Sequence, residues 1–310
     1  MIFKTLCTAL CVGLLGAFAA ADDTLKIVTY NVQFLPGLAS MQNERREPAY
    51  RARRIVEELK DFDIVALQEV FHVEHKELIL DGFREAWGGE LNVVQSPHPD
   101  DRMTSGGCLI LTRLPIIQSN SCVYEHFSKP SEYGVRADGF AAKGAIHGRI
   151  ARNAESLDDY IDVFVTHLEA RADHLRPEQY KELAAFIGGY SSADHPALLL
   201  GDLNTNGVPE YRESSDSQYG QLMAALDKTR PGGFEDLWVK LMGGAHGGTT
   251  DQESAETGKR IDYVLMGKAQ GAVSALVPQS IRVEMFRDEK VHALSDHNAV
   301  VAEFIWGASD

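Results

Sequence analysis

Four apolar runs in this sequence each end in polar residues that are able to do chemistry. The runs are IVTYN, IVALQE, VFVTH and LLLGDLN, and the polar residues at their ends are Asn31, Glu69, His167, Asp202 and Asn204. Runs as continuously apolar as these are typical of strands that helices cover on both faces. Ligands of such sheets bind beyond the strand ends, so we expect these side chains to converge at one rim. Asp202 and Asn204 should face one target together, because residues two apart in an extended chain point the same way.

Helical segments alternate with the strand-like runs. The segment EPAYRARRIVEELK has apolar residues at helical spacing, and RPEQYKELAAFIGGY begins with Pro177 near its first turn and ends at a Gly pair. Further helices are predicted at 215–227 and 234–241, and strands at 25–32, 63–70, 139–150, 160–168, 196–204, 260–266, 273–285 and 298–306. The alternation predicts an α/β fold without a domain boundary. We interpret the Gly- and Ser-rich stretch 243–258 as a mobile surface loop.

The first 21 residues have the pattern of a cleaved secretory signal. Lys4 gives a positive start, LCTALCVGLLGAF gives a short apolar core, and small residues ending at Ala19 or Ala21 offer a cleavage site. The apolar run is short for a membrane span, and no later stretch is predicted to cross a membrane. We therefore expect a mature catalytic domain at 22–310, secreted to the periplasm or the exterior.

Two cysteines would remain after cleavage. They are Cys108 and Cys122, in the segment GGCLILTRLPIIQSNSC, which we interpret as a hairpin over 107–123 that turns at Leu114-Pro115. Such a hairpin would bring the two thiols roughly opposite each other, and an oxidising compartment would permit a disulfide. Two buried free thiols are the alternative.

Two later segments bring further polar residues to strand starts. KRIDYVL places Asp262 at the start of one strand, and LSDHNAVV places Asp296 and His297 just before another. Strands that run in the opposite direction would deliver these residues to the same rim. The combined set is rich in carboxylates and amides, which are hard oxygen ligands suited to Mg²⁺, Mn²⁺ or Ca²⁺. No Gly-x-Ser-x-Gly elbow is present, and a metal with His and Asp suits hydrolysis of a phosphoester.

The charge of the chain weighs against a polyanionic partner. Its formal net charge is −15 at pH 7, so it repels polyanions at long range. Neutralisation of phosphates usually dominates binding to nucleic acids. Nucleic acid is therefore the less favoured substrate, although a local basic groove would suffice to bind it.

Six short motifs, in this order, resemble the endonuclease/exonuclease/phosphatase superfamily. They are TYNV, LQEV, THL, GDLN, RIDYV and SDH, and they extend from Tyr30 to His297. The resemblance implies a deoxyribonuclease-I-like fold, a four-layer α/β sandwich of two packed sheets flanked by helices. ADGFAAKGAIHGRI, with Lys143, and THLEARADHLRPEQYKEL, with Arg176 and Gln179, resemble the neutral and bacterial sphingomyelinase branch.

The resemblance implies roles for the metal site and the general base. Glu69 would be the principal Mg²⁺ ligand, with Asn31 beside the site and Asp296 as a second metal contact. His297 would take a proton from the water that attacks phosphorus, and Asp262 would orient its imidazole.

Four more residues would act on the phosphate. Asp202 and Asn204 would contact the phosphate and the attacking water, His167 would stabilise the charge of the transition state, and Lys143 would contact the phosphate. Several of these assignments have a structural alternative: a turn at Asn31 and at Asp202–Asn204, a helix N-terminal charge at Glu69 and a solvated loop charge at Lys143.

These inferences together predict a secreted, Mg²⁺-dependent phosphodiesterase of the sphingomyelinase C type. It would cleave sphingomyelin at a membrane surface to ceramide and phosphocholine, and we expect a monomer. A secreted deoxyribonuclease-I-like endonuclease, a phosphatase for soluble phosphoesters, and a catalytically silent membrane-adhering protein are the alternatives. The sequence leaves the choice of lipid head group open.

Overall fold

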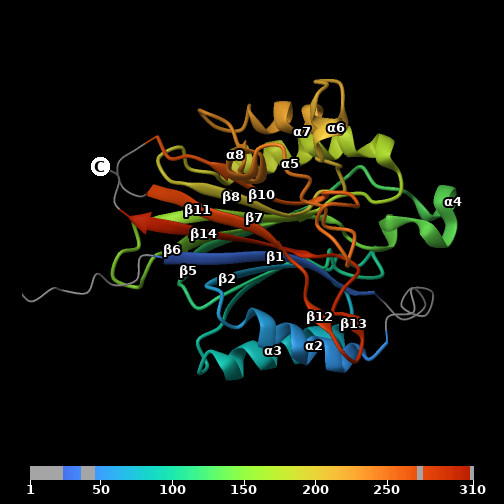
Figure 1. Cartoon of the computed structure of the whole chain (residues 1–310), viewed down its shortest axis with the longest axis horizontal. Coiled ribbons are helices and arrows are strands. Elements are labelled where there is room, and N and C mark those ends of the chain that lie inside the picture. The colour runs from blue at the N-terminus through green and yellow to red at the C-terminus, as the bar shows by residue number, and fades with distance from the viewer. Residues whose placement is uncertain (1–23, 36–45, 271–274, 308–310) are drawn as a thin grey trace, which may run out of the picture.

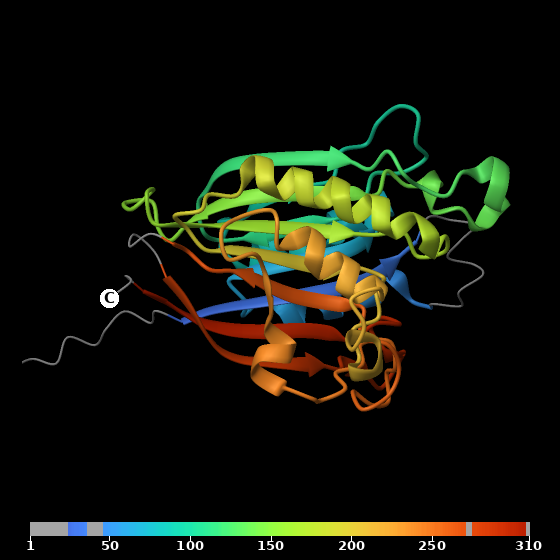
Figure 2. The ribbon, with the colours of Figure 1, turned by 90° about the horizontal axis from the view of Figure 1, so that it is seen from above.

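The computed structural model describes residues 24–35, 46–270 and 275–307, and the predicted signal sequence 1–21 lies outside them. Two six-stranded sheets pack face to face in the centre of the molecule. Helices α2 (Pro48–Leu59) and α3 (Val73–Ala86) cover the outer face of the first sheet, and α5 (Arg176–Tyr190) and α7 (Gln218–Leu226) cover that of the second (Figures 1 and 2). The predicted four-layer α/β sandwich is confirmed.

The first sheet is built from both ends of the chain. Its strands, in spatial order, are β11 (Ala275–Glu284), β14 (Ala299–Gly307), β1 (Thr24–Phe34), β2 (Ile64–Val70), β4 (Leu109–Thr112) and β3 (Asn92–Gln95). Strands β1 and β2 run parallel, whereas β14 runs antiparallel to β1. The end of β1 and the end of β2 therefore lie at the same edge as the start of β14.

The second sheet is built from the middle of the chain. Its strands, in spatial order, are β5 (Ile116–Val123), β6 (Gly144–Ala151), β7 (Tyr160–His167), β8 (Ala197–Asp202), β10 (Asp262–Gly267) and β9 (Glu235–Asp236). Strands β7 and β8 are parallel, and β10 is antiparallel to β8. This sheet thus repeats the arrangement of the first, with two strand ends and one strand start at one edge.

Shorter elements complete the described chain. They are α4 (Pro130–Tyr133), α6 (Pro209–Arg212), α8 (Leu237–Met242), the 3₁₀ turns Gly134–Arg136, Asp138–Phe140 and Asp173–Leu175, and a small hairpin of β12 (Arg287–Asp288) and β13 (His292–Ala293). The side chains of Ser217 and Asp236 accept hydrogen bonds from the first turns of α7 and α8. Within the described ranges, no helix has both the length and the apolar character that a membrane crossing requires.

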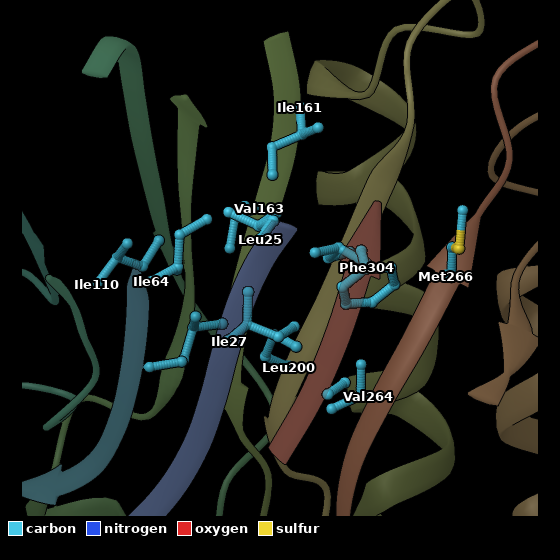
Figure 3. Packing of buried hydrophobic residues seen from close by; sticks show 14 of the residues in the cluster. Leu25, Ile27, Ile64, Ile110, Ile161, Val163, Leu200, Val264, Met266 and Phe304 are labelled. Atoms are coloured by element: carbon cyan, nitrogen blue, oxygen red, sulfur yellow. The ribbon is translucent and has the colours of Figure 1, made fainter. Parts of the chain in front are cut away.

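Both faces of the central strands are covered, which explains why the sequence runs are continuously apolar. One face of each strand packs in a core between the sheets, and the other packs beneath the outer helices. In β1, for example, Ile27 lies in the core between the sheets and Val28 lies under α2 and α3. Figure 3 shows the inter-sheet core, with Leu25, Ile27, Ile64, Val163, Leu200 and Phe304 among its members.

The predicted hairpin over 107–123 is wrong, and so is the disulfide that depended on it. Strand β4 lies between β2 and β3 in the first sheet, whereas β5 is an edge strand of the second. The residues of β4 are all buried while β5 is half exposed, so the two runs suit different positions. Cys108 packs in the inter-sheet core, Cys122 packs against the core beneath α5 and α7, and both are free thiols.

The stretch 243–258 was predicted to be a mobile surface loop, and part of it is firmly bound. Thr249 is fully buried, and its hydroxyl accepts a hydrogen bond from the backbone N–H of Ile261. Its carbonyl accepts another from the N–H of Asn298. The loop therefore joins the start of β10 to the start of β14.

Candidate active site

The polar strand ends converge at one edge of the sandwich, as the sequence predicts. Asp202 ends β8, with His167 beside it at the end of the parallel strand β7 and Asp262 opposite it at the start of the antiparallel strand β10. Asn31, near the end of β1, donates a hydrogen bond from Nδ2 to Asp202 Oδ2 at 3.0 Å and so joins the two sheets. His297 precedes β14 at the same edge.

Asp202 is the centre of this cluster. Its side chain is almost fully buried, and its Oδ2 atom lies 3.5 Å from His167 Nε2 and 3.8 Å from His297 Nε2. Burial raises the pKa of Asp202 to about 6, and the neighbouring carboxylate of Asp262 contributes to this rise, against the opposing charge of His297. Burial and the second carboxylate therefore outweigh the nearby positive charge at this position.

Glu69 lies on the other side of His167. Its Oε1 atom is 3.8 Å from His167 Nε2, and its side chain is 18% exposed. Its backbone has a positive φ of 60°, an uncommon left-handed conformation for a residue other than Gly. Burial, and then the charge of Asp296, raises the pKa of Glu69 to about 7. Crowded carboxylates with raised pKa values are what a bound cation would relieve.

His297 and Asp262 form a direct pair. His297 Nδ1 lies 2.9 Å from Asp262 Oδ2, so Nδ1 carries the hydrogen and Nε2 faces Asp202. Burial alone would lower the pKa of His297, but Asp262, followed by Asp202 and Asp296, raises it well above its usual value. The pair has the arrangement of a general base, in which Asp262 stabilises the charged form of the His297 imidazole through Nδ1.

Lys143 is a buried, paired cation, and the alternative of a solvated loop charge is wrong. It is 5% exposed, and its Nζ atom donates to Asp138 Oδ2 at 2.7 Å and to the Leu168 carbonyl at 2.8 Å. Nζ also lies 3.1 Å from His167 Nε2. Burial would lower the pKa of Lys143, but Asp138 raises it overall, so the lysine is charged.

His167 is neutral beside that lysine. Burial and then the charge of Lys143 lower the pKa of His167 well below its usual value. Nε2 therefore accepts from Lys143, and the hydrogen is on Nδ1, a buried atom without a hydrogen-bond partner among the described residues. The positive charge that faces the cluster belongs to Lys143 rather than to His167.

Asn204 and Asp296 both reach the site, with protein partners of their own. The N–H of Asn204 donates to Asp202 Oδ1 at 2.9 Å, which is the predicted Asx turn, and its Nδ2 donates to the Leu168 carbonyl at 3.1 Å. Asp296 accepts from Gln33 Nε2 at 2.5 Å. Asp296 acts on Glu69 through its charge, and its role as a second metal contact stays a prediction.

Sequence reasoning missed three residues of this region. Gln33 binds Asp296, Asp138 binds Lys143, and the carboxylate of Glu169, fully buried, accepts from both the N–H and the hydroxyl of Ser128. A signal existed for Gln33, which follows Asn31 by two residues, and for Glu169, which follows His167 by two. Asp138 lies on a loop, where no periodicity points to it.

The donor set fits a divalent cation. Ligand atoms of Glu69, His167 and Asp202 lie within 4.8 Å of one another, and so do those of Asp202, Asp262 and His297. Buried Asp262 Oδ1 lacks a hydrogen-bond partner among the described residues. Carboxylate oxygens are the ligands that Mg²⁺ prefers, so Glu69 and Asp202 are the residues best suited to hold such an ion.

The sequence matches one family over most of its length. The model described as "Endonuclease/Exonuclease/phosphatase family" matches residues 28–297. Sphingomyelinase C of Leptospira interrogans is 27% identical over 215 residues, which are 61% of this chain and 36% of that protein. The chain thus spans little more than a third of the length of this curated relative.

Solved structures share the fold at low identity. Sphingomyelinase C from Streptomyces griseocarneus matches with a TM-score of 0.61 and 19% identity, over 90% of this chain and 99% of that one. A beta toxin structure from Staphylococcus aureus with bound magnesium ions matches with a TM-score of 0.62 and 18% identity, over 92% and 99%.

Proposed function

The chain belongs to the endonuclease/exonuclease/phosphatase family, and from this membership we propose that it is a divalent-metal-dependent phosphodiesterase that hydrolyses sphingomyelin. The observation that carries the proposal is the cluster of Asp262, His297 and Asp202 beside Glu69, with the buried cation of Lys143 on the far side. This arrangement supplies a base, negative ligands and a positive charge around one point, as phosphoester hydrolysis requires.

The proton is moved by His297. Nε2 takes it from the water that attacks phosphorus, while Asp262 holds Nδ1–H and stabilises the imidazolium that forms. A P–O bond to water forms and the P–O bond to the ceramide oxygen breaks. The alkoxide takes a proton from solvent to give ceramide and phosphocholine, and His297 releases to solvent the proton that it took. A general base of this kind contributes about 10²–10⁴-fold to the rate.

The phosphate would be held by the remaining residues. Lys143 presents a charged Nζ, and Asn204 Nδ2 lies nearby because both donate to the Leu168 carbonyl. A divalent cation, held by Glu69 and Asp202, would neutralise phosphate charge and reduce the negative field that raises the pKa of His297. We propose Mg²⁺ as that cation, with Mn²⁺ or Ca²⁺ as the substitutes to test.

Two features support the lipid over a nucleic acid. The curated relative at 27% identity is a sphingomyelinase C, and the net charge of −15 disfavours a polyanion. The predicted signal at 1–21 supports action outside the cytoplasm, where a membrane surface is accessible.

One assay separates the candidate substrates. Purified protein starting at Asp22 is given sphingomyelin liposomes, phosphatidylcholine liposomes and supercoiled plasmid, each with Mg²⁺ and with EDTA, and His297→Ala serves as the inactive control. We expect EDTA-sensitive release of phosphocholine from sphingomyelin, absent in the variant, without plasmid nicking. Nicking without phosphocholine release would identify a nuclease, and release that persists in EDTA would refute the metal.

A further inference from the structure

The loop that follows β8, residues 203–208, carries Asn204 in a conformation that needs support. Asn204 has a φ of 47°, in the left-handed region, which persists in folded proteins when the surroundings fix it. Leu203 N–H donates to the carbonyl of Ile261, and Gly207 N–H donates to that of Arg260. The loop is thereby joined to the chain that enters β10, two residues before Asp262.

The side chain of Arg260 fastens the far end of this loop. It is 2% exposed, and its Nε and Nη2 atoms both donate to the Gly207 carbonyl, at 3.1 and 2.8 Å. Nη2 and Nη1 also donate to the carboxylate of Asp236, at 2.8 and 3.3 Å. The guanidinium lies over the ring of Tyr263, 4.5 Å from its centroid.

Two tyrosines fasten the middle of the loop. Tyr263 OH donates to the Thr205 carbonyl at 2.6 Å, and Tyr180 OH lies 2.6 Å from Thr205 Oγ1. A Cβ atom on Gly207 would lie 2.3 Å from Tyr263 OH and 2.4 Å from Arg260 Nη2. Any larger residue there would push these two groups out of place, so the loop is packed directly on the arginine and the tyrosine.

We propose that Arg260 is a positioning residue for the reaction: it fixes loop 203–208 and the start of β10 together, and so sets Asn204 and Asp202 against Asp262 and His297. It touches no reacting atom itself. The inference depends on the proposed phosphodiesterase function, but not on the identity of the lipid. Lys lacks the planar fork that holds one carbonyl and one carboxylate at once, so Arg260→Lys keeps the charge and releases the loop.

The chain contains a matched control at the opposite end of the same strand pair. Arg230 is 5% exposed, and its Nη2 atom donates to the carbonyls of His195, just before β8, and Lys268, just after β10, at 2.7 and 2.8 Å. Each arginine therefore joins one end of β8 to the neighbouring end of β10. Arg260 does so at the active-site edge, and Arg230 does so at the opposite end. A loss of sheet stability alone would affect both variants alike.

The experiment compares Arg260→Lys, Arg230→Lys and Tyr263→Phe in the chain from Asp22. Hydrolysis of bis(p-nitrophenyl) phosphate, a generic diester, is measured beside sphingomyelin, with thermal unfolding and ¹H–¹⁵N spectra. We expect both arginine variants to lose stability, and Arg260→Lys alone to lose about 10–100-fold in kcat, because small misplacements of catalytic groups cost about that much. kcat is measured at saturating Mg²⁺, so that weaker metal binding through a displaced Asp202 does not contribute to the difference.

The outcomes distinguish this inference from the proposed function. The amide signals of Asp202 and Asn204 should shift or broaden in Arg260→Lys and stay in place in Arg230→Lys, whatever the substrate is. Unchanged signals in a folded Arg260→Lys, or an equal loss of kcat in both arginine variants, would overturn the inference. If Arg260→Lys does not fold, Tyr263→Phe provides the test, because it removes another bond to loop 203–208. A fall in kcat above about fivefold would support the positioning role of this loop, and an unchanged kcat would refute it. If the wild type cleaves the generic diester but not sphingomyelin, only the proposal that sphingomyelin is the substrate is refuted.

Discussion

Replacing Glu69 by Gln should make the metal-free protein more stable while it removes activity. Glu69 is enclosed at the end of β2 with the charge of Asp296 nearby, and these two causes raise its pKa from 4.5 to about 7. An acid whose pKa is raised in the folded state destabilises that state as the pH rises from the unfolded value through the folded one. The amide in Glu69→Gln cannot ionise, so the variant would avoid this penalty above neutral pH.

The size of the effect follows from the two pKa values. Each pKa unit corresponds to about 1.4 kcal/mol, so moving from 4.5 to about 7 gives about 3 kcal/mol at about pH 8. The difference should shrink to about 1 kcal/mol or less at about pH 5, where the carboxyl is mostly protonated in the folded state. For a chain of this size about 3 kcal/mol raises the melting temperature by about 5 °C.

The assay is thermal unfolding of both proteins in EDTA at about pH 8 and pH 5, and then in Mg²⁺ at pH 8. Mg²⁺ should stabilise the wild type, by about 2.7 kcal/mol at a concentration of about 100 times Kd, and should have little effect on Glu69→Gln. The control is Glu169→Gln, because that buried carboxylate accepts from Ser128, Arg171 and Ala172 and its amide would face donors, at a cost of about 1–3 kcal/mol. The reasoning is refuted if Glu69→Gln melts below the wild type in EDTA at pH 8.

Three further outcomes are expected. His297→Ala should lower kcat about 10²–10⁴-fold and leave the melting temperature within a few degrees; near-normal turnover would remove it from the role of base. Asp162 is buried near the start of β7, at the end of the strand far from His167, and has a lowered pKa because hydrogen bonds from its neighbours outweigh its burial. The ionised carboxylate of Asp162 stabilises the fold above the unfolded pKa of about 3.9, and this stabilisation is lost as the pH falls below it. Asp162→Asn should therefore lower the free energy of unfolding, measured in urea at neutral pH, by about 3–5 kcal/mol. A difference that is no smaller at about pH 3 would contradict this pH dependence. Cys108 and Cys122 should react with a thiol reagent after unfolding without a reductant, and a protein that needs reduction first would contradict the free thiols.

The strand ends were predictable because their signal is local. Alternation along an apolar run determines which residues share a face, and the direction of neighbouring strands then brings Asn31, Glu69, His167 and Asp202 to one edge. The same argument reaches Asp262 and His297, because a strand that runs in the opposite direction starts where the others end. The chemistry of the cluster is therefore readable from the order of six short motifs.

The predictions that failed concern contacts between segments whose sequences show no regular alternation of apolar residues. The sequence around Leu114 shows two strand-like runs and a turn, which predicts a hairpin, but the choice of sheet depends on burial in three dimensions. Asp138 and Lys143 meet because a loop folds over the end of β7, and nothing in their spacing requires it. The buried hydroxyl of Thr249, which holds the start of β10, is likewise a tertiary contact of a Gly-rich loop.

The path of the chain between the sheets has a consequence for how activity arises. Among the described strands, residues 116–267 form the whole second sheet, and the first sheet is made of the pieces on either side. The bond from Asn31 to Asp202 and the bond from His297 to Asp262 both cross this seam. Each half alone holds an incomplete catalytic centre, so turnover during refolding should return only after the halves have docked. Separately produced fragments would be silent until they were mixed, and complementation would report docking directly.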